Sequence, residues 1–231
     1  MKSTDLLAQR GTPPGALGRM LIWGAGGHAK VVAELARLCG YEVKGHVDID
    51  AGRVGEQAEP GGARVVMDER SFNQLLDDPK RDFDALAVGI GKNAARLAAL
   101  ELFHNVVDLP VLVHPSAVLS SSCVLGAGSV VFANVVVNAA ASIGMGAILN
   151  SACVVEHDCR LDDGVHISPN ATLAGAVSVG RLSWVGAGAT VIEKVRIGER
   201  VTVGAGAVVL SEVSDGLTVV GCPAKALPSA R

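Results

Sequence analysis

A six-residue pattern of aliphatic residues runs through the second half of the chain. From Val113 to Val209 every sixth residue is Val, Leu or Ile, at 17 successive positions without an insertion. The residue four places after each of them is always Ala, Ser, Cys or Val. One large aliphatic and one small residue per six is the signature of a parallel β-helix, in which three units form an 18-residue coil. Residues 113–214 therefore predict between five and six coils, with strands stacked about 4.8 Å apart.

The first half of the chain has a different pattern. Met20–Trp23 is a short apolar run that predicts a strand, and it is followed by the glycine-rich segment Gly24–Lys30. Val31–Leu38 has helical spacing of its apolar residues and ends before a glycine, and Val43–Val47 predicts a second strand. Strand, glycine turn, helix and strand in this order predict a βαβ unit.

The glycine turn matches a nucleotide-binding fingerprint. Gly24-x-Gly26-x-x-Ala29 is followed about 20 residues later by Asp48, the place of a ribose-binding acid. A third predicted strand, Phe83–Val88, is also followed by glycines and then by a helix through Leu102. Because this part of the chain has only about 90 residues, it predicts a site for one nucleotide rather than for a dinucleotide. The alternative interpretation is a purely structural pair of turns.

Composition agrees with the repeat and excludes a membrane segment. Hydrophobic residues make up 49% of the chain and aromatic residues only 3%, as expected for a narrow, repeating interior that cannot hold large rings. The 47 residues from Leu109 to Val155 contain no Asp, Glu, Lys or Arg. Ser, Asn and Gly nevertheless recur in this stretch with the six-residue period, which a spanning helix of about 20 apolar residues would not show. The stretch is therefore assigned to the β-helix.

Charge and cysteine content narrow the class of protein. A net charge of −3 and a pI near 6.1 argue against a nucleic-acid-binding protein, which usually has a basic face. The N-terminal residues lack the apolar core of a signal peptide, and five cysteines without a C-x-x-C spacing favour reduced thiols. We therefore expect a cytoplasmic protein. Cys123, Cys153 and Cys159 occupy the small interior position of the repeat and are interpreted as packing residues.

Three motifs in order resemble one family. They are the Gly24–Lys30 turn, the entry His114-Pro115-Ser116-Ala117 into the repeats, and the closing Gly221-Cys222-Pro223-Ala224-Lys225. Together they resemble the nucleotide-sugar acetyltransferases of the left-handed β-helix class, including the bacillosamine- and perosamine-type N-acetyltransferases and proteins like sialic acid O-acetyltransferase. The resemblance implies a homotrimer that takes acetyl-CoA, with no metal, at the groove between neighbouring β-helices. The predicted parts are a leader (1–18), a Rossmann-like α/β domain for the nucleotide sugar (19–110), a left-handed β-helix (111–214) and a C-terminal tail (215–231).

The first charged residues after the uncharged stretch indicate the chemistry. Glu156, His157 and Asp158 follow it directly, and His157 lies outside the packed interior positions. A histidine titrates near neutral pH and can take the proton of an attacking amine or hydroxyl, although a solvated surface histidine is the alternative. The resemblance places the general base in this segment, so we expect His157 to be catalytic. It also implies an adjacent acid, commonly Glu, and Asp158 is one methylene shorter.

Other site residues follow from spacing or from the resemblance. His166 lies nine residues after His157, half a coil away, so both reach one ligand only where two subunits meet. The resemblance implies that His166 contacts the thioester region and that Asn150 lies near the substrate. It also implies that Gly175, Ala187 and Ala205 bind acetyl-CoA. Lys225 in the closing motif is the candidate to neutralise the CoA phosphates, with a plain lysine of the tail as the alternative. The expected nucleotide-sugar-binding residues of the first domain are Gly26, Gly27, His28, Asp48 and Gly89.

The expected activity is N-acetylation of a nucleotide-linked 4-amino-4,6-dideoxy sugar for glycan synthesis, by direct attack on the thioester of acetyl-CoA. O-acetylation of a sugar acid such as sialic acid is the alternative, since spacing does not distinguish an amine from a hydroxyl. Two remote alternatives are a non-catalytic binding protein and a β-helix carbonic anhydrase. The latter needs three placed metal ligands, and only His114, His157 and His166 lie in the repeats.

Overall fold

The computed structural model describes residues 17–228 except 77, 79 and 80. Of the predicted leader, only Leu17 and Gly18 lie within the described residues. The described chain forms two compact units, one ending at Leu112 and the other beginning at Val113.

The first unit is a four-stranded parallel sheet with the order β3-β2-β1-β4. Its elements are β1 Arg19–Trp23, α2 Gly27–Leu38, β2 Glu42–Asp48, the 3-10 helix η1 Ala51–Arg53, β3 Val65–Asp68, α3 Glu69–Leu76, β4 Ala85–Val88 and α4 Asn93–Phe103. The predicted βαβ unit is confirmed, and β3 with α3 adds a strand and a helix that the hydrophobic pattern did not predict. Phe83, placed in a strand by the pattern, precedes β4 and is buried.

Aromatic side chains gather in this first unit. Trp23 packs edge-on against Phe72 and Phe103, with ring centroids 5.3 and 4.8 Å apart, and Phe83 lies 5.5 Å from Phe72. These four rings, all nearly fully buried, hold α3 and α4 to the sheet. Four of the large rings of the chain therefore form the core of the first unit.

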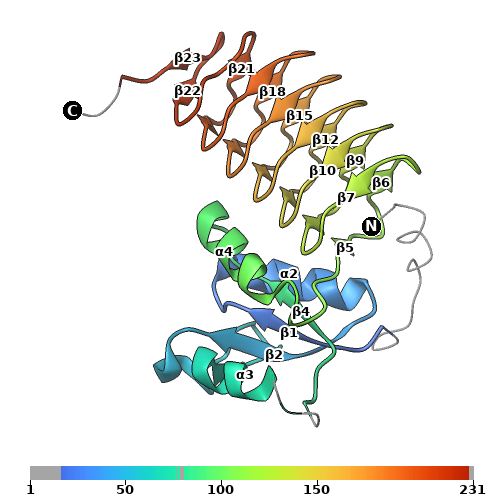
Figure 1. The fold of residues 1–231 in the computed structure, drawn as a ribbon, viewed down its shortest axis with the longest axis vertical. Helices are drawn as coiled ribbons and strands as arrows, with labels where there is room; N and C mark the ends of the chain where they lie inside the picture. The colour runs from blue at the N-terminus through green and yellow to red at the C-terminus, as the bar shows by residue number, and fades with distance from the viewer. Residues whose placement is uncertain (1–16, 77, 79–80, 229–231) are drawn as a thin grey trace. The chain divides into compact units, whose positions relative to one another are not determined.

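The second unit is a parallel β-helix with three faces (Figure 1). Face 1 contains β5 Leu112–Val113, β8 Val130–Val131, β11 Ile148–Leu149, β14 His166–Ile167, β17 Trp184–Val185, β20 Thr202–Val203, β22 Thr218–Val220 and β23 Lys225–Ala226. Face 2 contains β6 Val118–Leu119, β9 Val136–Val137, β12 Val154–Val155, β15 Thr172–Leu173, β18 Thr190–Val191 and β21 Val208–Val209. Face 3 contains β7 Val124–Leu125, β10 Ser142–Ile143, β13 Arg160–Leu161, β16 Ser178–Val179 and β19 Arg196–Ile197.

Every strand register joins residues 18 apart up to β21, which is the predicted coil length. Fifteen of the 17 aliphatic repeat residues are buried; only Val113 and Leu119 are half-exposed, in the first coil, which has no coil before it. All residues at the small position are buried as well. Within the segment assigned to the tail, β22 pairs with β20 and extends face 1.

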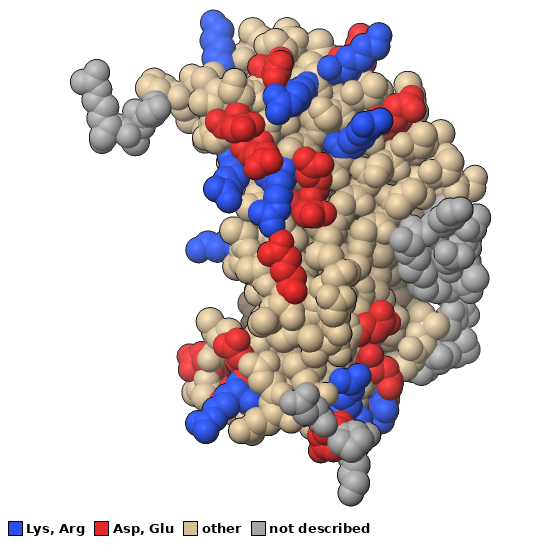
Figure 2. Space-filling view, viewed as in Figure 1, with Lys and Arg blue, Asp and Glu red and all other residues tan. Residues whose placement is uncertain are grey.

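Charge is unevenly spread over the β-helix surface. On the face shown in Figure 2, charged side chains cluster over the later coils, and a wide area of the earlier coils has none. This area corresponds to the uncharged residues 109–155. No helix among the described residues is long and apolar enough to cross a membrane.

Candidate active site

His157 and Asp158 form a hydrogen-bonded pair at the corner between faces 2 and 3. They occupy the turn between β12 and β13, and Asp158 has a φ of 60°, which Asp tolerates better than most residues. His157 Nδ1 lies 2.8 Å from Asp158 Oδ2, and the two side chains are 60% and 63% exposed. Because a carboxylate only accepts, Nδ1 carries the proton and Nε2 of the neutral ring is left to accept one. This is the arrangement of a general base with an orienting acid.

Two neighbours from adjacent coils complete this corner. Glu156 Oε2 accepts a hydrogen bond from Asn138 Nδ2 at 2.9 Å, one coil earlier. On the other side lies Gly175, one coil later. A Cβ atom on Gly175 would lie 2.7 Å from both Cε1 and Nε2 of His157, closer than real contacts allow. Gly175 therefore makes room for the imidazole ring.

A second polar cluster lies around His166 on face 1. Asn150 Nδ2 is 3.2 Å from His166 Nε2, and Asn150 Oδ1 accepts the backbone N–H of Ser151 at 2.9 Å. That second bond fixes the orientation of the amide, because a backbone N–H can only donate. The Asn150 NH2 group must then donate to Nε2, so His166 carries its proton on Nδ1 in this arrangement.

Trp184 supports the same ring. It pairs with His166 in register on neighbouring strands, and the two rings stack at 5.8 Å with an angle of 13°. The indole Nε1 donates to Ser168 Oγ at 2.6 Å, which holds a side chain that is otherwise 47% exposed. Neither Trp184 nor Ser168 was predicted. The signal was available, because Trp184 follows His166 by 18 residues, one coil.

The predicted acetyl-CoA residues lie on two different corners. Gly175 shares the corner of His157, between faces 2 and 3. Ala187 and Ala205 are exposed turn residues one coil apart at the corner between faces 1 and 2, next to the strands that carry His166 and Trp184. Lys225 is exposed in β23. His157 and His166 also lie apart on one chain, the first at a corner and the second in a strand of face 1.

The five predicted residues of the first unit do come together. Gly26, Gly27, His28, Asp48 and Gly89 all line one pocket of about 460 Å³ at the carboxyl ends of β1, β2 and β4. Its other lining residues are Trp23, Gly24, Ala25, Val47, Ile49, Ile90, Gly91 and Lys92. Helix α2 begins at Gly27 at this edge, where N–H groups without helical partners favour an anion such as a phosphate.

The glycines of this pocket have different structural roles. A Cβ atom on Gly26 or Gly27 would meet nothing within 4 Å, so these residues leave open space at the pocket. A Cβ atom on Gly89 would lie 2.6 Å from the Cα atom of Ala29. Gly89 therefore permits the close packing of the β4 turn on helix α2, and its place in the pocket wall follows from that packing.

Arg53, which was not predicted, connects two parts of this pocket. Its Nη1 donates to Asp48 Oδ2 at 2.6 Å, and its Nη2 lies 3.3 Å from the carbonyl oxygen of Ala25 in the glycine turn. The Asp48 side chain is only 11% exposed. The predicted ribose-binding acid is thus oriented by an arginine from η1.

A buried network supports the glycine turn from below. His46 is fully buried, with Nδ1 2.8 Å from the carbonyl oxygen of Gly24 and Nε2 2.8 Å from Glu59 Oε1. Glu59 also receives two hydrogen bonds from Arg37, at 2.6 and 3.0 Å. Burial acts to raise the pKa of Glu59, but the bonds from Arg37 and His46 outweigh it and the pKa lies below its usual value. The network keeps a charged carboxylate beneath the turn.

The second turn is held by a buried arginine. Arg96 is 1% exposed and donates to the carbonyl oxygens of Ile90 and Gly91 at 3.3 and 3.0 Å and to Asn93 Oδ1 at 2.9 Å. Burial lowers the pKa of Arg96 to about 10, so it is charged at neutral pH. Its charge lies close to His28.

His28 is neutral in this environment. Burial, reinforced by the positive charge of Arg96, lowers the pKa of His28 to about 4. At neutral pH the ring therefore offers a ligand hydrogen bonds and no charge.

We expect His28 to make folding stability depend on pH. The unfolded chain binds a proton at this residue near pH 6.5 and the folded chain only near pH 4, so stability should fall as the pH drops through this window. The full loss at pH 4 and below is on the order of 3 kcal/mol. Urea unfolding of the wild type and of His28→Gln between pH 4 and 7 measures it.

The His28→Gln variant serves as the control for the wild type, because the carboxylates that titrate in acid lower the folding stability of both proteins alike. The difference between the two unfolding free energies should change over the window. Parallel pH profiles for the two proteins would refute a buried neutral His28.

Among the described residues, no group of three or more His, Cys, Asp or Glu side chains is arranged to hold a metal ion. The three histidines of the repeats are each bonded elsewhere: His114 to Ser116, His157 to Asp158 and His166 to Asn150. The geometry therefore offers acid–base chemistry at His157 and a nucleotide-sized pocket in the first unit.

Comparison with known proteins agrees with both units. Residues 19–103 match the PglD N-terminal domain model, and residues 176–211 match the bacterial transferase hexapeptide model of six repeats. A curated relative, GDP-perosamine N-acetyltransferase of Escherichia coli O157:H7, is 28% identical over 73% of this chain and 75% of its own length.

Solved structures extend the similarity over the whole fold. A histidine-to-asparagine mutant of perosamine N-acetyltransferase from Caulobacter crescentus, in complex with CoA and GDP-perosamine, is 40% identical, with a TM-score of 0.84 over 93% of this chain and 99% of that one. The acetyltransferase domain of PglB from Neisseria gonorrhoeae FA1090, in complex with acetyl coenzyme A, is also 40% identical, with a TM-score of 0.81 over 90% and 99%. This chain belongs to the left-handed β-helix nucleotide-sugar acetyltransferases, a family of acyltransferases that use acetyl-CoA to N-acetylate an amino sugar carried by a nucleotide.

Proposed function

We propose that the chain acetylates the 4-amino group of a GDP-linked 4-amino-4,6-dideoxy sugar of the perosamine type. The observation that carries this proposal is the 40% identity over almost the entire length to an enzyme bound to CoA and GDP-perosamine. The nucleotide diphosphate binds in the pocket of Gly26, Gly27, His28 and Asp48. A cytoplasmic location, where acetyl-CoA and sugar nucleotides are available, is part of the proposal.

The reaction is direct acyl transfer. The amine nitrogen attacks the thioester carbonyl carbon, and His157 Nε2 takes the proton that the nitrogen loses. Asp158 stabilises the resulting imidazolium through its bond to Nδ1. When the C–S bond breaks, this proton passes to the sulfur, so the products are the N-acetyl sugar and CoA. His157 ends the cycle neutral, as it began.

His166 has a different part in this proposal. The amide of Asn150 donates to His166 Nε2, so that nitrogen does not act as a base. We assign His166 to contact with the thioester region of acetyl-CoA, held in place by Asn150 and Trp184. Asn150 then acts through His166, whereas the resemblance had implied that it lies near the sugar.

A trimer is part of the proposal for a geometric reason. His157 and His166 lie at different places around one coil, so a single ligand meets both only where two β-helices face one another. Ala187, Ala205 and Lys225 would then line the acetyl-CoA side of that groove, and Gly175 the side of His157. Light scattering of the purified protein tests the trimer.

The activity itself is tested by release of the CoA thiol from acetyl-CoA with a panel of acceptors. We expect turnover with GDP-perosamine, weaker turnover with UDP- or dTDP-linked 4-amino sugars, and none with sialic acid. Treating the product with mild base distinguishes the classes, because an ester is cleaved and an amide is stable. Turnover of sialic acid to a base-labile product would instead establish the O-acetyltransferase alternative.

A further inference from the structure

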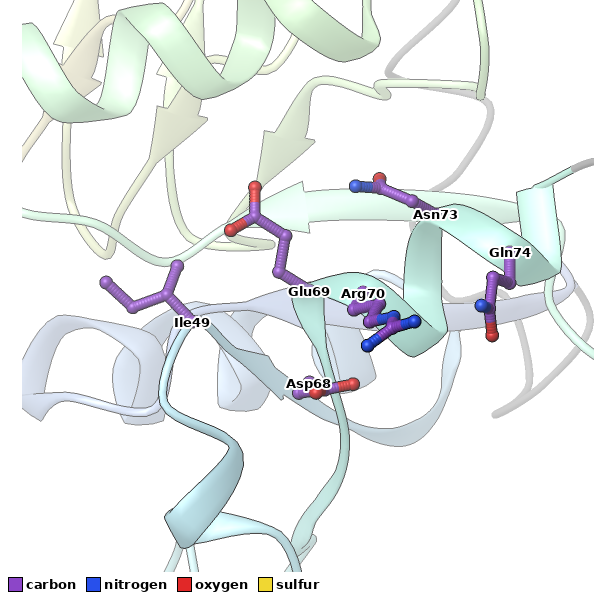
Figure 3. Close-up of a pocket in the computed structure, with 6 residues that line it drawn as sticks. All are labelled: Ile49, Asp68, Glu69, Arg70, Asn73 and Gln74. Atoms are coloured by element: carbon purple, nitrogen blue, oxygen red, sulfur yellow. The ribbon is translucent and has the colours of Figure 1, made fainter.

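A second hollow adjoins the nucleotide pocket of the first unit (Figure 3). It has a volume of about 610 Å³ and lies where β3 ends and α3 begins. Its lining residues are Ile49, Asp68, Glu69, Arg70, Asn73 and Gln74. Ile49 also lines the nucleotide pocket, so the two hollows meet at this residue.

Ile49 lies at the edge that the nucleotide pocket shares with the second hollow. It directly follows Asp48, the acid in the position that binds a ribose in this type of fold. A base attached to a ribose at Asp48 would have Ile49 as its next neighbour along the chain, at the point where the two hollows meet. The Ile49 side chain is 74% exposed, which leaves an apolar surface that a flat base would cover.

The two carboxylates of the second hollow differ in whether they already have hydrogen-bond partners. Asp68 Oδ1 accepts the backbone N–H of Ser71 at 2.9 Å, and the side chain and backbone of Ser71 hold the pKa of Asp68 below its usual value. Asp68 is thus committed to the start of α3. The Glu69 side chain makes no hydrogen bond or ion pair with any residue in the described part of the chain.

Glu69 and Asn73 act from the same side of α3. They are four residues apart, which places their side chains next to one another on one helix face. In Figure 3 both extend above the helix, with Glu69 between Ile49 and Asn73, whereas Asp68 and Gln74 lie lower. A carboxylate therefore stands between an exposed aliphatic side chain and an amide.

We propose that Ile49, Glu69 and Asn73 form the nucleobase site and that Glu69 selects guanine. Guanine presents two adjacent donors, N1–H and the 2-amino group, which one carboxylate can accept together. Uracil and thymine present one N–H between two carbonyl oxygens, which a carboxylate repels. Asn73 supplies an amide donor for guanine O6. This inference rests on the proposed function and specifies which nucleotide its substrate carries.

Calorimetric titration of the full chain with nucleoside diphosphates tests the site without any catalytic step. We expect GDP to bind about tenfold or more tighter than UDP and dTDP, the size of a good bidentate contact to a base. Inosine diphosphate lacks the 2-amino group and should bind with intermediate affinity. Tighter binding of UDP or dTDP than of GDP would overturn the proposal.

The decisive variant is Glu69→Gln, which keeps the shape of the side chain and removes the charge. It should weaken GDP about tenfold, weaken inosine diphosphate less, and leave UDP unchanged or improved. Glu34→Gln, an exposed carboxylate on α2, is the matched control and should change none of them. An equal loss for all four diphosphates would indicate a general electrostatic effect and refute selection by Glu69, as would no loss for any of them.

Failure of this site and failure of the proposed function give different results. If GDP-perosamine is acetylated but Glu69→Gln leaves the preference for GDP intact, the base site is refuted and the activity stands. If GDP binding depends on Glu69 but no nucleotide sugar supports thiol release, the base site stands and the acetyl transfer is refuted. The side chains of Glu69 and Glu34 are both accessible, so we expect thermal unfolding of Glu69→Gln and Glu34→Gln to match that of the wild type.

Discussion

Replacing His157 with alanine is expected to lower kcat by a factor of about 100 to 10,000, the usual contribution of a positioned general base. The KM values for acetyl-CoA and the nucleotide sugar should change little, because the loss concerns proton transfer. The melting temperature should also stay the same, since the side chain is 60% exposed and its ring is hydrogen-bonded to the exposed Asp158. Steady-state thiol release and a thermal melt measure these quantities.

Two further variants test the assignment. Asp158→Asn keeps an oxygen that can accept from Nδ1 but removes the charge that stabilises the imidazolium, so we expect a smaller loss of kcat. His114→Ala is the control. It removes another histidine of the same β-helix, one that is hydrogen-bonded to Ser116, and should leave kcat unchanged. A His157→Ala protein that keeps more than about a tenth of wild-type turnover would contradict the role of general base.

The β-helix could be predicted because every coil imposes the same packing requirement on its residues. Each coil presents the same interior, so one aliphatic residue in six must point inward, and the same rule holds for 17 units in succession. Deviations occur only at an end: Val113 and Leu119 are half-exposed because no earlier coil covers them. A repeated constraint of this kind is visible in a single sequence, whereas a constraint that occurs once is not.

The first unit shows that limit. Strand β3 has four residues and α3 has eight, and only Phe72 of α3 is buried. So short an element carries too few apolar positions to show a period. The contact of Arg53 with Asp48 depends on a 3-10 turn, and the bond from His46 to Gly24 joins residues 22 apart across the sheet. Neither follows from a local pattern.

The candidate site lies between these cases. His157 was predicted from its place after the uncharged stretch and from the resemblance, whereas its neighbours follow from the coil length: Gly175 lies 18 residues after it, and Asn138 lies 18 residues before Glu156. The same spacing joins His166 to Trp184. Once a period of 18 is known, the residues one coil above and below each candidate can be read directly. The roles of residues across a subunit groove do not follow from it, because they depend on a second chain.

Gly175→Ala is expected to lower kcat at least about tenfold while leaving the fold intact. The new methyl group would stand 2.7 Å from Cε1 and Nε2 of His157, so the ring must turn away from its place. That movement costs little stability, because the ring is exposed and Gly175 does not have the positive φ that would strain an alanine. Proton transfer, however, requires Nε2 within hydrogen-bond reach of the amine, and a displacement of about 1 Å can cost a factor of 100.

A double-mutant cycle separates this effect from a direct effect on acetyl-CoA, the role that the resemblance implies for Gly175. If Gly175 acts by placing the ring, adding Gly175→Ala to His157→Ala should lower kcat no further, because the ring is already absent. The KM for acetyl-CoA should then be the same in His157→Ala and in the double variant. If the methyl group instead blocks the CoA channel, both kcat/KM for acetyl-CoA and CoA binding should fall in the double variant as much as in the single one. Additive losses would thus place Gly175 in the CoA channel, and non-additive losses would make it a positioning residue for the base.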